Sequence, residues 1–440
     1  MLGHSSSAAR SGKPSRRVTL GAVPDPIFPA LHIRPARGWV NDPNGVCLVD
    51  GRYHVFFQHN PDAPWHGNVH WGHVSSTDLL RWEHHPVALL PRPGMIDAAG
   101  CWSGCVTDDA GVPTAVYTAN PNDARHAVVA LARSDRSLLS WQQDDAAVVA
   151  TPVRPGLDEV RDPFVFSYDG RRYAVQGAGH RNGRPQLLVW ACDDLTHWQE
   201  LGVLLTDDDP VAAQLTPANI WECPNLVRID DRWVLLVSLW AWANDTHQLV
   251  GVRYLLGDLV AEGIGLRFKA TSSGVLDTGP AFYAPQVLPG TDRTLLWGWA
   301  WEIGRTPEQI IQAGWAGLLT FPRELFVRDG DLCSRPAAEL TGLRSAELSS
   351  SQPWQEHAFE IVASGPTILR LIEGNQQRTV VAVAGSVHDP ARIFVDGSII
   401  ETFSGGAVHT ARAYPSASSR WSIEAADDGV RVYRLAIADD

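Results

Sequence analysis

The sequence predicts an all-β protein, a five-bladed β-propeller followed by a C-terminal β-sandwich. Three observations support this fold class. Helical periodicity is weak, short runs rich in Val, Leu, Tyr and Trp recur between turns of Gly, Asp and Asn, and one diffuse motif returns at a regular interval. A chain of 440 residues, 45% of them hydrophobic, is long enough to bury the cores of two or three domains.

The repeated motif indicates propeller blades. Ser76–Trp82 returns as Ser134–Trp141 and again as Cys192–Trp198, and the three tryptophans are separated by 59 and then 57 residues. A period of this length suits one four-stranded blade with its loops, so residues 30–328 would hold about five blades. The alternative is that Asp-Leu-x-x-Trp closes a recurrent hairpin in some other all-β fold.

Composition shifts suggest the domain boundaries. Residues 1–28 are rich in Ser and Arg and are expected to form a disordered lead. Ser15-Arg16-Arg17 is faintly similar to a twin-arginine export signal, but prolines end the apolar region that such a signal needs, so a cytoplasmic location is expected and secretion is the lesser alternative. The expected divisions are residues 29–330 for the propeller, 331–345 for a linker and 346–440 for the sandwich.

Charge and hydropathy exclude two classes of partner. The net charge of −13 and the pI near 5.6 argue against nucleic acid, which basic patches bind. The longest apolar stretch, Trp233–Ala243, is too short to span a bilayer, so no membrane association is expected.

Six cysteines in so long a chain do not make a disulfide framework, and reduced thiols are expected. The oligomeric state stays open.

Three acidic residues stand beside apolar or aromatic neighbours: Asp42 in Trp39-Val40-Asn41-Asp42-Pro43-Asn44-Gly45, Asp162 in Arg161-Asp162-Pro163-Phe164 and Glu222 in Trp221-Glu222-Cys223-Pro224. Equivalent positions of successive blades converge on the central channel of a propeller, so the three carboxylates can face one cavity. Hydrolysing a glycoside with retention needs one carboxylate to attack the anomeric carbon and one carboxylic acid to protonate the leaving oxygen. The three acids suit this chemistry.

These motifs resemble those of glycoside hydrolase family 32, the invertases, inulinases and levanases. Further segments resemble the family in family order: Trp71-Gly72-His73, Gly100-Cys101-Trp102-Ser103-Gly104, Phe282-Tyr283-Ala284-Pro285-Gln286, Gly314-Trp315-Ala316-Gly317, Phe321-Pro322-Arg323-Glu324-Leu325 and Ile393-Phe394-Val395-Asp396-Gly397-Ser398. The resemblance covers about residues 30–440. An ordered set of this size is hard to attribute to chance.

The resemblance implies a role for each acid and a set of sugar contacts. Asp42 would be the nucleophile, Glu222 the general acid/base and Asp162 a transition-state stabiliser, and no cofactor would be needed. The positions that would line the fructose subsite are Asn41, Gln58, Trp65, Trp71, Trp102, Ser103, Arg161, Tyr283 and Trp299. The implied activity is that of a retaining β-fructofuranosidase acting on terminal fructosyl units of sucrose, fructo-oligosaccharides or fructans.

Simpler interpretations stand beside these assignments. Taken alone, Asp42 would be a turn residue, the pair Arg161 and Asp162 would be a surface or interblade ion pair, and most of the 18 tryptophans would be blade core. No metal is expected at His66, His70 and His73, because strand alternation places them on different faces. The same alternation predicts that the Cys223 thiol points away from Glu222 into the packing.

Three residues depart from the family pattern, and two other functions are compatible with parts of the sequence. Val40, Trp102 and Asn225 stand where Met, Phe and Asp are common in the family, which puts substrate preference in doubt. A fructosyltransferase would use the same three acids, with a sugar hydroxyl in place of water. A non-catalytic carbohydrate-binding propeller is the alternative of another class, and the loss of an acid would be its expected mark.

Overall fold

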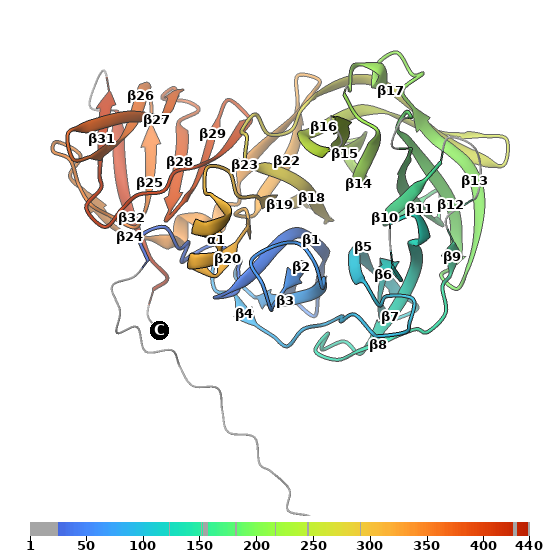
Figure 1. Cartoon of the computed structure of the whole chain (residues 1–440). Helices are drawn as coiled ribbons and strands as arrows, with labels where there is room; N and C mark the ends of the chain where they lie inside the picture. The colour runs from blue at the N-terminus through green and yellow to red at the C-terminus, as the bar shows by residue number, and fades with distance from the viewer. Residues whose placement is uncertain are drawn as a thin grey trace, which may run out of the picture.

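The computed structural model describes residues 25–122, 124–150, 152, 157–180, 183–215, 217–243, 246–290, 292–425 and 429–438. Figure 1 shows five strand bundles in a ring around a central opening, with a further β unit packed beside the ring. The expected five-bladed propeller with a β-sandwich is therefore confirmed. Most of the expected disordered lead at 1–28 lies outside the described residues, up to residue 24.

The first two blades come from the N-terminal part of the ring. Blade 1 consists of β1 (Gly38–Val49), β2 (Arg52–Asn60), β3 (His70–Ser76) and β4 (Glu83–His84). Blade 2 consists of β5 (Gly100–Asp109), β6 (Val112–Asn120), β7 (Val128–Ser134), β8 (Trp141–Gln143) and β9 (Val149–Ala150), with the 3-10 turn η1 (Ala124–His126) between β6 and β7.

Blades 3 to 5 complete the ring. Blade 3 consists of β10 (Glu159–Tyr168), β11 (Arg171–Gly179), β12 (Gln186–Asp194) and β13 (His197–Thr206). After η2 (Ala212–Gln214), blade 4 consists of β14 (Ile220–Ile229), β15 (Arg232–Ala243), β16 (Thr246–Glu262) and β17 (Gly265–Val275). Blade 5 consists of β18 (Phe282–Pro289), β19 (Thr294–Ala300), β21 (Leu318–Leu319), β22 (Arg323–Arg328) and β23 (Asp331–Pro336).

The sandwich packs two sheets over its own apolar core. One sheet has the order β24 (Arg344–Leu348), β32 (Val430–Leu435), β25 (Ala358–Ala363), β28 (Ala391–Asp396), β29 (Ile399–Ser404) and β30 (Ala407–Arg412). The other has the order β27 (Gln376–Ala384), β26 (Pro366–Glu373) and β31 (Arg420–Ala425). The expected tight turn at Asp396-Gly397 joins β28 to β29, where Asp396 pairs with Ile399.

The connection between the two units differs from the expected linker at 331–345. Asp331–Pro336 is β23, which pairs with β22 at the outer edge of blade 5. The 3-10 turn η3 (Ala338–Leu343) follows, and β24 then joins the sandwich by pairing with β32. The Asp-Gly turn before residue 331 is a hairpin turn within a blade, which is why it does not mark a domain boundary.

The repeated Asp-Leu-x-x-Trp motif lies at the same place in three blades. It connects β3 to β4, β7 to β8 and β12 to β13, the outer hairpin of each blade. Leu79 and Leu138 both adopt a positive φ there and are fully buried. The repeat therefore marks the outer edge of the blades, far along each sheet from the central opening.

Every inner strand of the ring carries a β-bulge at an equivalent position. The strands β1, β5, β10, β14 and β18 surround the central opening, and in each of them two residues face one residue of the neighbouring strand. The bulged pairs are Asn41-Asp42, Trp102-Ser103, Asp162-Pro163, Cys223-Pro224 and Ala284-Pro285. A bulge bends the strand and redirects the side chains beside it, so these five positions decide what faces the opening.

Side chains satisfy the backbone at three of the bulges. Asp162, Cys223 and Ala284 have φ of 60°, 46° and 44°, a region that disfavours side chains other than glycine. Their N–H groups leave the strand ladder and donate to Thr118 Oγ1 at 2.8 Å, Asp162 Oδ2 at 3.0 Å and Ser238 Oγ at 3.2 Å respectively. The residue that follows each of them is proline, which has no N–H to satisfy.

Parallel pairing closes the ring. The short strand β20 (Trp315–Ala316), reached through the helix α1 (Pro307–Ala313), comes from the blade 5 segment and pairs in parallel with β1 of blade 1. Buried amides join further blades: Gln286 of β18 donates to the Gly104 carbonyl at 2.7 Å and accepts from the Val46 N–H at 2.9 Å. These bonds hold the inner strands in a fixed arrangement.

A fully buried ionic network joins the propeller to the sandwich. Arg323 of β22 donates to Glu401 of β29 at 2.6 Å and to Asp277 at 2.7 Å. His32, near the start of the described chain, contacts Asp396 at 2.8 Å and Glu401 at 3.0 Å. All five side chains are at most 1% exposed. Because water cannot reach them, each buried charge is stabilised by the opposite charges of its partners.

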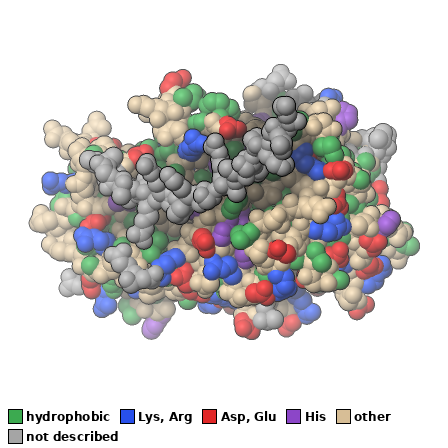
Figure 2. All heavy atoms as spheres, turned by 90° about the horizontal axis from the view of Figure 1, so that it is seen from below, with side chains coloured by type: hydrophobic (Ala, Val, Ile, Leu, Met, Phe, Trp, Pro, Cys, Tyr) green, Lys and Arg blue, Asp and Glu red, His purple; other side chains and the backbone are tan. Residues whose placement is uncertain are grey.

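No helix in the described part of the chain is long and apolar enough to cross a membrane. Figure 2 shows one face of the molecule, on which acidic and basic side chains are interspersed. All six cysteines are free thiols.

Candidate active site

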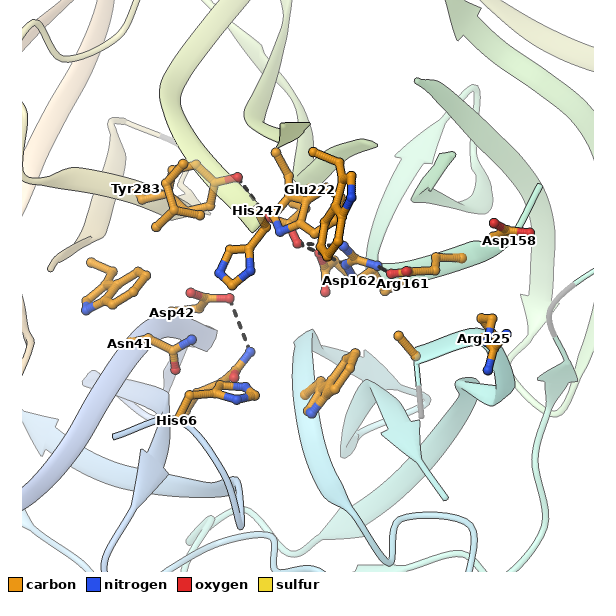
Figure 3. Close-up of a pocket in the computed structure, with 18 of the residues that line it drawn as sticks. Asn41, Asp42, His66, Arg125, Asp158, Arg161, Asp162, Glu222, His247 and Tyr283 are labelled. Atoms are coloured by element: carbon orange, nitrogen blue, oxygen red, sulfur yellow. Dashed lines mark hydrogen bonds and ion pairs between the residues drawn. The ribbon is translucent and has the colours of Figure 1, made fainter. Parts of the chain in front are cut away.

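The central opening contains a cavity of about 740 Å³. Figure 3 shows Asp42, Asp162 and Glu222 pointing into it from three different strands, β1, β10 and β14. The cavity therefore brings together the three acids that the sequence singled out. Six of the nine sequence-predicted sugar contacts also line it: Asn41, Gln58, Trp102, Arg161, Tyr283 and Trp299.

Asp42 is held by one oxygen only. Its Oδ2 accepts from Ser103 Oγ at 2.6 Å and from Gln58 Nε2 at 3.1 Å. Among the described residues no donor reaches Oδ1. The carboxylate is thus fixed in orientation by one oxygen, while the other has no protein partner and is available to a ligand in the cavity.

Asp162, on β10, is also held through one carboxylate oxygen. Its Oδ2 accepts from the Cys223 N–H at 3.0 Å, and its own N–H donates to Thr118. Within the described chain, Oδ1 of Asp162 likewise has no hydrogen-bond donor. Two carboxylate oxygens that lack protein donors therefore belong to residues of one cavity.

Glu222 has both oxygens bound. Arg161 donates to Oε1 from Nε at 3.0 Å and from Nη2 at 2.8 Å, and the Tyr283 hydroxyl donates to Oε2 at 2.7 Å. Arg161 also forms an ion pair with Glu159 through Nη1. This network keeps the Glu222 side chain in one position, with hydrogen-bonding partners on both oxygens.

The position of Cys223 contradicts the strand-alternation prediction. Its Sγ lies 3.5 Å from Asp42 Oδ2 and 3.6 Å from Asp162 Oδ2. The prediction was wrong because Cys223 is the first residue of the bulge in β14, where its φ of 46° breaks the alternation of side chains. The thiol contacts two acids of the cavity while it also packs against the edge of the blade core.

Burial dominates the electrostatics of the acids. Loss of solvent raises the pKa of Asp42 to about 7, the Ser103 hydrogen bond opposes this rise, and the charges of Asp162 and Glu222 add to it. Burial likewise raises the pKa of Asp162, and the neighbouring Arg161 opposes that shift. Burial and the neighbouring carboxylates therefore both favour the protonated form of Asp42.

Three buried polar atoms without partners lie on cavity-lining residues. In the described part of the chain, Asn41 Oδ1, Trp102 Nε1 and Trp299 Nε1 are buried and make no hydrogen bond. Buried polar groups in native proteins are nearly always paired. The two indole nitrogens face the backbone at Gly100 and Gly317 and not the open cavity, so the rings of Trp102 and Trp299 can meet a ligand only through their apolar surface.

Three sequence-predicted contacts do not line the cavity, and these assignments need correction. Trp71 is fully buried in the core between blades 1 and 2, and its Nε1 donates to the Trp102 carbonyl at 3.0 Å. Trp65 is 55% exposed and lies outside the lining. Ser103 is buried behind Asp42, so its contact is with the carboxylate and not with the open cavity.

The sequence reasoning missed much of the cavity wall. The lining residues that it did not name as ligand contacts are Trp39, His66, Ala124, Arg125, Asp158, Glu159, Trp240, Trp242, His247 and Leu249. Trp240-Ala241-Trp242 carried a usable signal, since alternate residues of a strand share a face. Most of the other lining residues lie in loops or near strand ends, where the sequence pattern does not show which way a side chain points.

The three departures from the family pattern lie in different surroundings. Trp102 lines the cavity and can influence what binds there. Val40 is fully buried, and Asn225 is buried between blades 4 and 5, where its amide donates to the carbonyls of Cys223 and Pro285 at 2.9 Å. Of these three residues, Trp102 is the one that lines the cavity and can contact a substrate there.

The histidines considered for a metal are dispersed. His66 lines the cavity, His70 contacts the Asn68 carbonyl at 2.7 Å, and His73 packs against His54 with their ring nitrogens 3.0 Å apart. Across the described ranges, no group of three or more His, Cys, Asp or Glu side chains is arranged to hold a metal ion.

Comparisons with known proteins give one consistent result. The family model described as the glycosyl hydrolases family 32 N-terminal domain matches residues 32–336. A raffinose invertase of Escherichia coli is 32% identical over 451 residues, covering 89% of this chain and 90% of its own. A sucrose-6-phosphate hydrolase of Escherichia coli is 30% identical over 458 residues, covering 92% and 93%.

Solved structures agree with the sequence relatives. The GH32 β-fructofuranosidase BmSUC1 of Bombyx mori is 26% identical with a TM-score of 0.76, covering 93% of this chain and 94% of its own. A mutant of the same enzyme in complex with sucrose matches equally well. Fructan 1-exohydrolase IIa of Cichorium intybus, in complex with 1-kestose, is 20% identical with a TM-score of 0.74 over 94% and 99% of the two chains, which shows a shared fold.

Proposed function

The chain belongs to glycosyl hydrolases family 32 and is a glycoside hydrolase with fructosidase activity, and we propose that it is a retaining β-fructofuranosidase. It removes terminal non-reducing β-D-fructofuranosyl units from sucrose, fructo-oligosaccharides or fructans through a covalent fructosyl-enzyme intermediate. The observation that carries this proposal is the convergence of Asp42, Asp162 and Glu222 on one cavity with a distinct set of contacts for each acid.

Asp42 is the proposed nucleophile. Ser103 and Gln58 hold its Oδ2, so Oδ1 can approach the anomeric carbon of the fructosyl ring without losing a protein hydrogen bond. As the bond from Oδ1 to the anomeric carbon forms, the bond from that carbon to the leaving sugar breaks. The ring becomes attached to the enzyme as an ester.

Glu222 is the proposed general acid and base. It gives its proton to the departing glycosidic oxygen, and its carboxylate then takes a proton from water as the water oxygen attacks the anomeric carbon and the ester to Asp42 breaks. Arg161 and Tyr283 fix the position of the Glu222 side chain for both steps. Glu222 ends the cycle with its proton restored.

Asp162 is the proposed stabiliser of the transition state. Positive charge develops on the fructosyl ring in an oxocarbenium-like transition state, and a nearby carboxylate lowers its energy. Oδ1 of Asp162 can accept a hydrogen bond from a ring hydroxyl, because Oδ2 is already bound to the Cys223 N–H. The rings of Trp102 and Trp299, which line the same cavity, offer apolar faces to the sugar.

Fructose release from sucrose tests this proposal. Asp42→Asn should lose turnover by several orders of magnitude, because an amide is a very poor nucleophile. Asp193→Asn, which removes an exposed carboxylate outside the cavity lining, is the matched control and should retain the wild-type rate. Turnover of Asp42→Asn at the rate of that control would refute the nucleophile assignment. Product analysis at high sucrose separates hydrolysis from transfer, since a transferase would form fructan oligomers in place of free fructose.

A further inference from the structure

We infer that the leaving-group side of the cavity binds an uncharged sugar on an aromatic wall and discriminates against a phosphorylated one. The inference rests on the proposed function, because it places the departing sugar beside Glu222. It concerns residues that play no part in bond cleavage.

The acid fixes where the leaving sugar lies. A general acid must reach the glycosidic oxygen, so the sugar beyond that oxygen lies on the Glu222 side of the cavity. Arg161 connects Glu222 to the rest of this side: it pairs with Glu159, and its guanidinium carbon lies 5.6 Å from the centre of the Trp240 ring. Figure 3 shows Asp158 and Arg125 on this side of the cavity, away from Asp42.

One wall of this side is a hairpin with an aromatic face. The strands β15 and β16 pair Trp240 with Leu249 and Trp242 with His247, and all four side chains line the cavity. The rings are nearly stacked, with centroids 5.6 Å apart for Trp240 and Trp242 and 5.8 Å apart for Trp240 and His247. Apolar faces of this kind pack against the C–H surface of a sugar ring.

The other wall is acidic. Asp158 and Glu159 both line the cavity, and both side chains keep contact with solvent, at 37% and 20% exposure. With Asp42, Asp162 and Glu222, the described lining contains five carboxylates and two arginines, Arg125 and Arg161. A phosphate monoester, which carries about −1.5 to −2 charges at pH 7, would lie beside the carboxylates of Asp158 and Glu159, which already pair with His180 at 3.1 Å and with Arg161.

The arginine nearest the acid is already occupied. Arg161 directs Nε and Nη2 at Glu222 and Nη1 at Glu159, so a phosphate could take the Nε–Nη2 edge only by displacing Glu222. Displacing Glu222 would also disturb the proposed acid. Recognition of a phosphate by arginine depends on donors that are available in a fork, and Arg161 does not offer them here.

The relatives of this chain include a raffinose invertase and a sucrose-6-phosphate hydrolase, which are 32% and 30% identical to it in sequence. Overall similarity therefore does not separate the two substrate classes. The aromatic and acidic walls of this cavity favour the uncharged class.

Steady-state kinetics on two matched substrates tests the inference. The substrates are sucrose and sucrose that carries a phosphate on its glucosyl unit, measured at low ionic strength. The wild-type kcat/KM should be at least about tenfold higher for sucrose, because like charges placed together disfavour binding. Added salt should narrow the difference, since it screens exposed charges.

Two variants with matched controls locate the effect. Asp158→Asn should raise kcat/KM for the phosphorylated substrate relative to sucrose by about threefold or more, whereas Asp193→Asn should leave the ratio unchanged. Trp242→Ala should raise KM for sucrose by about three- to tenfold with a smaller change in kcat. Ile264→Ala, which truncates an exposed apolar side chain outside the cavity lining, should not change KM.

The possible outcomes separate the inference from the proposed function. Equal or better kcat/KM for the phosphorylated substrate would overturn the inference and leave the fructosidase assignment intact. A Trp242→Ala variant with the same KM as Ile264→Ala would show that the aromatic wall does not bind the leaving sugar. Failure to release fructose from either substrate would contradict both the inference and the proposed function.

Discussion

The thiol of Cys223 lies 3.5 Å from Oδ2 of Asp42, although 181 residues separate the two in the chain. The same carboxylate oxygen accepts from Ser103 and Gln58, so donors from three blades surround it. The contact exists because the bulge in β14 turns Cys223 toward the opening. Local backbone geometry thus connects two motifs that are remote in sequence.

Removing this thiol should weaken activity without abolishing it. Cys223→Ala leaves the backbone N–H that holds Asp162 but removes the sulfur contact with Asp42. A thiol is a weak donor, and a typical hydrogen bond contributes about 1 kcal/mol, so kcat/KM should fall by about tenfold or less. Cys47→Ala, at a thiol of similar exposure on β1 outside the cavity lining, should have no effect. Identical kinetics of the two variants would show that the contact has no role.

The pH profile should follow the ionisation of Asp42. The nucleophile must be ionised, and its pKa is raised to about 7, so kcat/KM should fall as the pH falls through about 7. Ser103→Ala removes the hydrogen bond that favours the ionised form, so the acidic limb should move to higher pH. Ser167→Ala, at an exposed position of β10, is the control. A limb that stays in place, or that moves to lower pH, would contradict this role of Ser103.

The effect of Glu222→Gln should depend on the leaving group. Sucrose needs its departing oxygen protonated, so this variant should lose several orders of magnitude on sucrose. A substrate such as fructosyl fluoride needs far less protonation, and its first step should be slowed much less. Equal losses on the two substrates would argue against Glu222 as the acid.

The buried network between the domains should control stability. Arg323→Met leaves Asp277 and Glu401 buried without their cation, which should destabilise the protein by about 3–5 kcal/mol in denaturant unfolding. Arg420→Met, on the exposed side of β31, should change stability by less than about 0.5 kcal/mol. Similar unfolding midpoints for the two variants would mean that the network contributes little.

His32 in this network should make stability depend on pH. Despite the opposing effect of burial, the carboxylates of Asp396 and Glu401 raise the pKa of His32 above its ordinary value of 6.5. The stabilisation is therefore complete below pH 6.5 and is lost as the pH rises through the folded-state pKa. The difference in thermal midpoint between wild type and His32→Gln should be larger at pH 6 than at pH 9. A difference that grows toward pH 9 would contradict the raised pKa.

Sequence reasoning predicted the architecture because strands, turns and the blade repeat leave periodic patterns. It also predicted that Asp42, Asp162 and Glu222 face one cavity, because equivalent positions of propeller blades converge on the central channel and because their motifs resemble those of a known family. It failed where a bulge breaks alternation, as at Cys223, and where an aromatic residue is interior for reasons of packing, as at Trp71. The hairpin wall with Trp240 and Trp242 was missed because strand alternation shows that the two side chains share a face but not that this face meets the cavity, which depends on contacts between blades.

The most direct test of the account is to trap the sugar on the enzyme. The variant Glu222→Gln, supplied with fructosyl fluoride, should form the ester readily but hydrolyse it slowly, because the general base is missing. Mass spectrometry of the quenched and digested protein should then show one fructosyl unit on the peptide that contains Asp42. A fructosyl unit on the peptide of Asp162, or release of fructose with no covalent adduct, would contradict the claim that Asp42 is the nucleophile.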